Sequence, residues 1–123
     1  MTVLDTSALV RFFTNDLPAK VIQVQNLLDS KEILIIPDVV FPELEYVLLG
    51  STYRGERQNI LSAFRYLIAK KNIIVSKEVK LAVGLYHKTS LDMADCIIAA
   101  SSDGNLLLSF DEDLLKINKS LFK

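Results

Sequence analysis

Several residue types are scarce in this chain of 123 residues, which has one cysteine, one histidine, no tryptophan and four scattered glycines. The lone Cys96 cannot form an internal disulfide, so we expect it to be a small core residue. One cysteine and one histidine do not suffice for a typical zinc site. Scattered glycines supply no Gly-rich phosphate loop, and nothing in the spacing pairs His87 with a nucleophile and an orienting acid.

Long apolar runs and an excess of one charge are also missing. No apolar run approaches the roughly 18 residues of a membrane span, and no signal peptide precedes the apolar run that starts at Thr2. We therefore expect a cytoplasmic protein without a membrane partner. The net charge is −1, from 14 basic and 15 acidic side chains. This balance does not favour broad binding of duplex nucleic acid, but a nucleic-acid substrate held through a bound cation remains compatible with it.

Strand and helix patterns alternate from end to end. Half of the residues are hydrophobic, and short apolar runs at residues 2–4, 33–36, 73–75 and 106–109 alternate with helical periodicity. Alternation of this kind is typical of a parallel sheet covered by helices. The sequence predicts an α/β fold with a central parallel sheet of four or five strands and helices on both faces. We expect residues 1–123 to form one domain.

Acidic residues recur where such a fold brings chain segments together. Asp5 follows the first strand, Glu43 lies in the helix after the second, Asp95 starts a buried helix, and Asp111 and Asp113 follow the fourth strand. The carboxyl ends of strands and the amino ends of helices line the same crevice of a wound sheet. Each acid also has a local explanation, because aspartate is common at helix starts.

The sequence also predicts helix ends. Asp5, Asp16 and Asp92 are candidate N-caps, and Gly50 is well placed to end the helix that holds Glu43.

Glu43 and Glu45 lie close together in an apolar stretch of the chain. The sequence predicts that Glu43 is enclosed by apolar side chains and that Glu45 occupies a solvated helix flank. A buried carboxylate is costly unless it is paired or bound to a metal. Several carboxylates in one crevice repel unless a cation neutralises them. Oxygen ligands suit Mg²⁺ or Mn²⁺, and such a cation supports phosphodiester hydrolysis.

Four segments resemble the motif blocks of PIN-domain nucleases, and in length the chain is similar to the VapC-type toxins of toxin–antitoxin pairs. The segments are Val3-Leu4-Asp5-Thr6-Ser7, Pro42-Glu43-Leu44, residues 92–100 and residues 107–113. They occur in the family's order and extend over essentially the whole chain. The last block departs from the pattern, because Leu114 stands where the family usually has an aromatic residue.

The resemblance implies a PIN-like three-layer sandwich and an endoribonuclease that depends on Mg²⁺ or Mn²⁺. Its catalytic and metal-binding residues would be Asp5, Glu43, Asp95 and Asp111, with Asp113 as the alternative to Asp111. Ser7 and Ser109 match the family's supporting hydroxyl positions. The resemblance further implies an RNA substrate, a homodimer and an antitoxin protein that covers the acidic groove.

Two other functions are compatible with the sequence. One is a PIN-like module that has lost catalysis and serves in protein interaction, although all four acids are present. The other is a phosphotransfer enzyme with Asp5 as an aspartyl nucleophile. Enzymes of the haloacid-dehalogenase type have a second aspartate two residues later, where this chain has Ser7.

Overall fold

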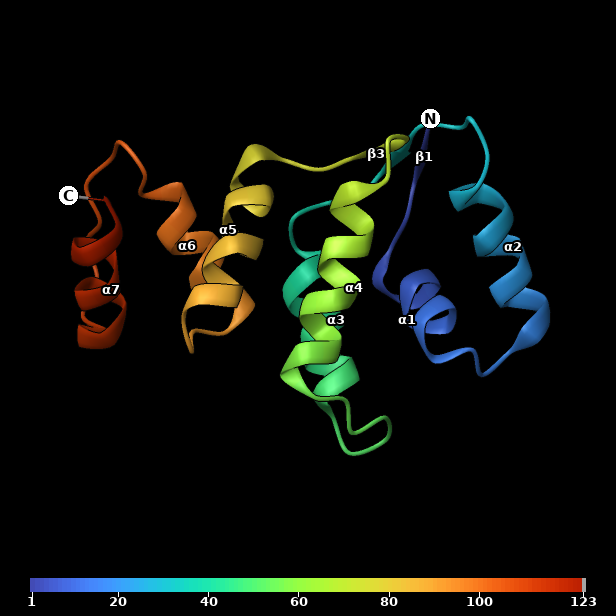
Figure 1. The fold of residues 1–123 in the computed structure, drawn as a ribbon, viewed down its shortest axis with the longest axis horizontal. Coiled ribbons are helices and arrows are strands. Elements are labelled where there is room, and N and C mark those ends of the chain that lie inside the picture. Colours follow the sequence, from blue (N-terminus) through green and yellow to red (C-terminus); the bar gives the residue numbers. More distant parts are fainter. Residues whose placement is uncertain (123) are drawn as a thin grey trace. The chain divides into compact units, whose positions relative to one another are not determined.

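The computed structural model describes residues 1–122, with side chains placed up to residue 118. The chain divides into two compact units, Met1–Ser76 and Lys77–Lys123, and each unit is described by itself. The elements, labelled in Figure 1, are β1 (Thr2–Val3), α1 (Thr6–Thr14), α2 (Pro18–Leu28), β2 (Leu34–Ile35), α3 (Val40–Leu49), α4 (Arg57–Ala69), β3 (Ile73–Ile74), α5 (Lys77–Lys88), α6 (Met93–Ser101) and α7 (Glu112–Phe122).

The first unit is built on a parallel sheet with the strand order β1-β2-β3. Leu34 in the central strand pairs with Thr2 on one side and with Ile73 on the other. Parallel neighbours need long crossover connections, and the helix pairs α1–α2 and α3–α4 provide them. In Figure 1, the two helices of each pair lie next to each other. The prediction of an α/β fold with a parallel sheet is confirmed.

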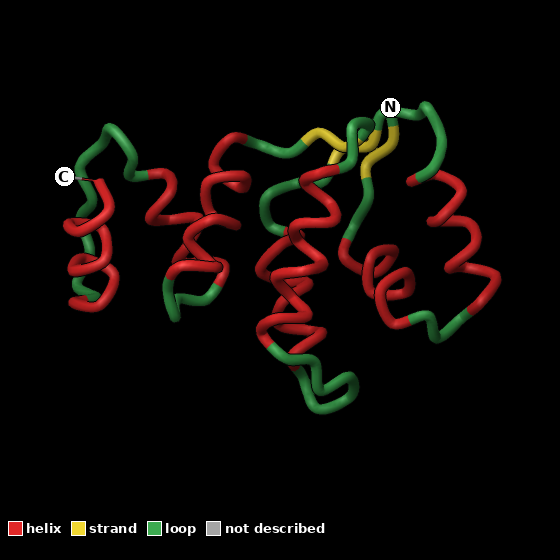
Figure 2. The backbone as a smooth tube through the Cα atoms, viewed as in Figure 1, coloured by secondary structure: helices red, strands yellow, loops and turns green. Residues whose placement is uncertain are grey.

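The predicted strand number was wrong, because the sheet has three strands rather than four or five. The structure has no strand at residues 106–109, and Figure 2 draws this stretch as loop. Among the described residues of the second unit there is no strand with which the segment could form a ladder, and an isolated strand is not stable. Leu106, Leu108 and Phe110 are therefore almost fully exposed, at 101%, 87% and 97%.

The core of the first unit lies where α3 packs against α4. Phe41 and Phe64 are both fully buried and meet edge to face, with ring centroids 5.3 Å apart and an interplanar angle of 60°. Edge-to-face contact is a favourable arrangement for two aromatic rings. Leu44 and Leu67, on the same two helices, are also fully buried.

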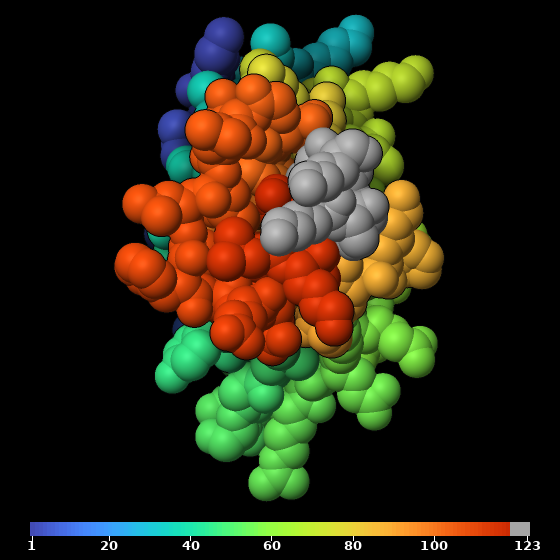
Figure 3. All heavy atoms as spheres, turned by 90° about the vertical axis from the view of Figure 1, so that its left-hand side faces the viewer, coloured from blue at the N-terminus to red at the C-terminus, as the bar shows by residue number. Residues whose placement is uncertain are grey.

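The second unit packs where α5 meets α6. Ala82 and Tyr86 of α5 and Met93, Cys96 and Ala99 of α6 are all buried, at 1% exposure or less. The prediction that Cys96 is a small core residue is confirmed. Figure 3 shows the surface of this unit, coloured orange to red, with side chains projecting from it.

Helix ends follow the predicted capping residues with one exception. Asp5 and Asp92 cap α1 and α6, and Gly50 ends α3, as expected. Asp16, expected to cap the next helix, does not do so, because α2 has Leu17 at its N-cap. Asp16 instead forms a 2.7 Å ion pair with Arg11.

The side-chain amide of Asn72 connects the start of β3 to the loop before β2. Its nitrogen donates to the carbonyl oxygens of Leu27, Ser30 and Glu32 at 3.4, 3.2 and 3.0 Å. Buried or partly buried carbonyl groups need such partners. The Asn72 amide therefore fixes the loop that delivers the chain into the central strand.

None of the described helices has the length and apolar character that a membrane span requires.

Replacing Phe64 with alanine should lower the free energy of unfolding by about 3–5 kcal/mol, because it opens a cavity opposite Phe41. Urea unfolding would measure this change. Tyr46→Ala, at an 82% exposed position on α3, is the matched control and should change stability by less than about 0.5 kcal/mol. Equal effects of the two substitutions would contradict the described core.

Candidate functional site

Asp5 lies between the end of β1 and the start of α1, where two donors hold its carboxylate. Its Oδ1 accepts the backbone N–H of Ala8 at 3.1 Å and the hydroxyl of Ser7 at 2.8 Å. The Ala8 N–H and then the Ser7 hydroxyl lower the pKa of Asp5, while partial burial opposes them. The side chain is therefore held as an oriented anion, and Ser7 supports it directly.

Glu43 lies in the first turn of α3, and its side chain is exposed. The hydroxyl of Thr6 donates to Oε1 of Glu43 at 3.2 Å. Because Thr6 follows Asp5 in the chain, this bond connects the start of α1 to the start of α3. We call Asp5 and Glu43 the first acidic pair.

The predicted environments of Glu43 and Glu45 were wrong. Glu45 is the buried acid, at 7% exposure, and Glu43 is the exposed one. Two residues correspond to about 200° around a helix, so the two side chains lie on opposite faces. The core face of α3 carries Phe41, Leu44 and Leu48, and Glu45 lies on that face.

Asp92 and Asp95 lie at the start of α6. Asp92 caps the helix, and its Oδ1 accepts the backbone N–H of Asp95 at 2.9 Å. Burial, the charge of Asp92 and the charge of Asp111 raise the pKa of Asp95, in that order of importance. We call these three residues the second acidic group. Their mutual repulsion is the electrostatic cost that a bound cation would remove.

Asp111 lies directly before α7. Its Oδ1 accepts the backbone N–H of Leu114 at 3.1 Å, and its own backbone N–H donates to the hydroxyl of Ser109 at 3.0 Å. Ser109 therefore supports the main chain of Asp111 rather than its carboxylate. Asp113 lies exposed in the first turn of the same helix.

The structure places the predicted site residues in two clusters, one in each unit. Asp5, Ser7 and Glu43 belong to the first unit, and Asp95, Ser109 and Asp111 belong to the second. Within the described residues, no group of three or more histidine, cysteine or acidic side chains is arranged to hold a metal ion. The assignment of the four acids to one centre therefore stays a prediction.

The available donors fit a hard divalent cation in their chemistry. Both clusters offer carboxylate oxygens supported by hydroxyl groups or backbone N–H groups, and such oxygens are the ligands that Mg²⁺ and Mn²⁺ prefer. In the second acidic group, burial and then the neighbouring charges of Asp92 and Asp111 raise the pKa of Asp95.

Sequence reasoning missed one residue of the site, Thr6, which orients Glu43. The signal was present in the run Asp5-Thr6-Ser7, where every residue can cap a helix or donate a hydroxyl bond. His87, by contrast, lies exposed in the last turn of α5, where the helix dipole favours a cationic side chain.

The fold is an α/β fold with a parallel sheet, and carboxylates lie beside its first strand and at helix starts. A protein of this kind is suited to binding a divalent cation. The family model of the PIN domain matches residues 2–120, and the chain belongs to this family. PIN domains are typically nucleases, and PIN-domain nucleases generally use divalent metal ions. No match was found among curated proteins or among solved structures.

Asp5→Asn should lower stability at neutral pH while leaving the cap in place, because asparagine also caps helices. The pKa of Asp5 is lowered in the folded state, so the stability that its charge provides is present above the ordinary value of 3.8. It is lost as the pH falls through the lower, folded value. Urea unfolding in EDTA from pH 7 to pH 3 should show the difference between wild type and variant shrinking with acid. A stability difference between wild type and Asp5→Asn that persists at low pH would contradict this account. In a Ser7→Ala background, the difference that Asp5→Asn makes at neutral pH should be smaller.

Asp95→Asn should change stability at neutral pH in the opposite direction. The pKa of Asp95 is raised in the folded state, so its ionisation costs stability as the pH rises from the ordinary value of 3.8 through the folded value. In EDTA the variant should therefore be more stable than wild type at pH 7 and should have no advantage at pH 3. The same urea series measures both substitutions, and a variant less stable than wild type at pH 7 would refute the prediction.

Proposed function

We propose that this protein is a divalent-metal-dependent endoribonuclease that hydrolyses phosphodiester bonds in RNA and acts as the toxin of a toxin–antitoxin pair. The observation that carries the proposal is the presence of a carboxylate at each of the four motif positions, three of them held by hydrogen bonds. Asp5, Glu43 and Asp111 accept these bonds, and Asp95 lies in the first turn of α6. Membership of the PIN domain family supports a nuclease over a phosphotransfer enzyme.

The metal ligands in this proposal are Asp5, Glu43, Asp95 and Asp111. A bound Mg²⁺ or Mn²⁺ supplies Lewis acidity for attack of water on a phosphodiester and for departure of the leaving oxyanion. Asp111 is favoured over Asp113 because its charge is among the causes that raise the pKa of Asp95. Its carboxylate is also fixed by the backbone N–H of Leu114.

The remaining site residues act by positioning. Ser7 donates to the carboxylate of Asp5, and Thr6 donates to that of Glu43. Ser109 accepts the N–H of Asp111 and so fixes the turn from which this carboxylate projects. Ligands that are oriented before a cation arrives lose less conformational freedom on binding it.

The proposed substrate is single-stranded or looped RNA, because its unpaired backbone can approach the carboxylates closely. A net charge of −1 gives no general attraction to duplexes. The proposed setting is the cytoplasm, the proposed assembly is a homodimer, and the proposed regulator is an antitoxin protein. A catalytically inactive interaction module is the alternative that the following experiment distinguishes.

Purified protein should cleave members of a mixed pool of structured and unstructured RNAs in Mn²⁺ or Mg²⁺ and should leave them intact in EDTA. Asp95→Asn should lower cleavage by at least about 100-fold, because it removes a metal-binding carboxylate. Gel electrophoresis of end-labelled RNA measures this loss.

Asp103→Asn is the matched control, because it makes the same chemical change at an exposed turn after α6. It should cleave as wild type does. Full activity in Asp95→Asn would refute the assignment of Asp95. If wild type cuts nothing and calorimetry detects no heat of Mn²⁺ binding, the protein is an interaction module.

A further inference from the structure

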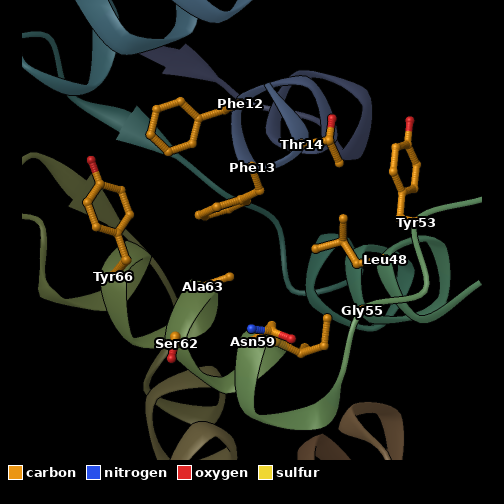
Figure 4. A pocket seen from close by; sticks show the side chains of 11 residues that line it. Phe12, Phe13, Thr14, Leu48, Tyr53, Gly55, Asn59, Ser62, Ala63 and Tyr66 are labelled. Atoms are coloured by element: carbon orange, nitrogen blue, oxygen red, sulfur yellow. The ribbon is translucent and has the colours of Figure 1, made fainter. Parts of the chain in front are cut away.

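A cavity of about 540 Å³ lies in the first unit among α1, α3, α4 and the loop between the last two helices. Four aromatic side chains line it together with a polar rim. We call it the aromatic pocket, and its lining includes Phe12, Phe13, Tyr53, Tyr66, Asn59 and Ser62. Figure 4 shows Phe12, Phe13 and Tyr66 on one side of the cavity and Tyr53 with Leu48 on the other.

Three of the rings form a preassembled wall. Phe12 stacks on Tyr66 with centroids 5.7 Å apart and an interplanar angle of 26°. Phe13 meets both rings edge-on, at 71° and 84°. Because the rings hold one another in place, a flat aromatic ligand would find its stacking surface already ordered, which reduces the entropic cost of binding.

The rim of the pocket offers hydrogen-bonding groups beside the rings. Asn59 uses its Oδ1 to accept the backbone N–H of Glu56 at 3.0 Å, so its amide nitrogen is the group that it can offer as a donor. Ser62 is exposed and adds a hydroxyl. Rings for stacking and polar groups for the ligand edge are the two features that bind an unpaired nucleobase.

A second cavity in the first unit shares a lining residue with this pocket. It has a volume of about 350 Å³, and Thr6, Ser7, Arg11 and Tyr53 are among the residues that line it. Tyr53 lines both cavities. Ser7 and Thr6 are the residues whose hydroxyls hold Asp5 and Glu43. The second cavity therefore shares Tyr53 with the aromatic pocket, and it is lined by the two residues that hold the first acidic pair.

The cationic side chains beside the two cavities are ion-paired. No carboxylate lines either cavity, and Arg11 lines the second one. Arg11 pairs with Asp16 through one terminal nitrogen, and its guanidinium carries further donors for phosphate. The carboxylate of Asp16 also accepts the hydroxyl of Tyr53 at 3.2 Å. Beside the aromatic wall, the ammonium of Lys70 lies 5.4 Å from the centre of the Tyr66 ring and pairs with Asp29 at 3.1 Å. Asp5 and Phe13 lie about 12 Å apart along α1.

We propose that the aromatic pocket binds one unpaired base of the RNA strand whose backbone passes the first acidic pair. The proposal rests on the proposed ribonuclease function and names a substrate determinant for it. The ring wall stacks on the base, the Asn59 amide and the Ser62 hydroxyl bond to its edge, and Arg11 contacts the intervening phosphate. Hydrogen-bonding groups at the rim, beside rings that can stack, favour a nucleobase over an apolar protein segment.

Binding can be tested apart from cleavage by working in EDTA. Fluorescence anisotropy would measure the affinity of wild type for a labelled single-stranded RNA of ten nucleotides. The same RNA would then be measured with an abasic site at each position in turn. Loss of the stacked base should weaken binding about fivefold to 150-fold at one position and little at the others.

Two pocket variants then link that position to the pocket. Phe13→Leu keeps an apolar side chain but removes a ring, and Ser62→Trp fills the rim from an exposed position. Both should weaken binding of the intact RNA, and both should abolish the penalty of the sensitive abasic site, because two changes to one contact are not additive. Gln58→Trp, exposed on α4 outside either cavity, is the matched control and should behave as wild type.

The outcomes separate this proposal from the proposed function. Equal losses of affinity from abasic sites at every position would overturn the base pocket. Pocket variants that are folded by circular dichroism and bind and cleave RNA as wild type does would also overturn it. Neither result would contradict the proposed nuclease. A protein segment would then be the occupant to consider. Base-dependent binding without metal-dependent cleavage would support the pocket and refute the nuclease. A wild type that neither binds nor cleaves RNA overturns both.

Discussion

The parallel register around β2 is the constraint on which the first unit depends. Leu34 pairs with both neighbours, so the three strands end at one edge of the sheet. The chain leaves β1 through Asp5 and Thr6 and leaves β2 toward α3. Both exits lie at the edge where ligands bind in wound sheets. The bond from Thr6 to Glu43 follows from this alignment, since residues 37 apart in sequence meet there.

The carboxylates proposed to bind the metal also hold the starts of helices. Oδ1 of Asp5 caps α1, and Oδ1 of Asp111 accepts an N–H in the first turn of α7. A capping bond uses one lone pair of a carboxylate, which has about four such sites. Helix capping and cation binding are therefore not competing explanations for these residues. The cap supplies the orientation that a ligand needs.

Features set by neighbouring residues could be predicted from the sequence, and features set by distant packing could not. The caps at Asp5 and Asp92 and the helix end at Gly50 are local, and all three were predicted. The burial of Glu45 depends on which face of α3 meets the core, which an apolar stretch on both sides of the acid does not reveal. A strand at residues 106–109 needs a hydrogen-bonding partner elsewhere in the chain, and apolar content alone does not supply one.

The side-chain amide of Asn72 makes the sheet sensitive to chemical change at one residue. Its amide nitrogen donates to three carbonyl oxygens of the loop that enters β2. Asparagine is among the thermolabile residues, and loss of its amide nitrogen leaves a carboxylate, which can only accept hydrogen bonds. Three carbonyl groups would then face an anion in place of a donor. Ageing at this single side chain would loosen the central strand and, through it, the acids that the strand ends position.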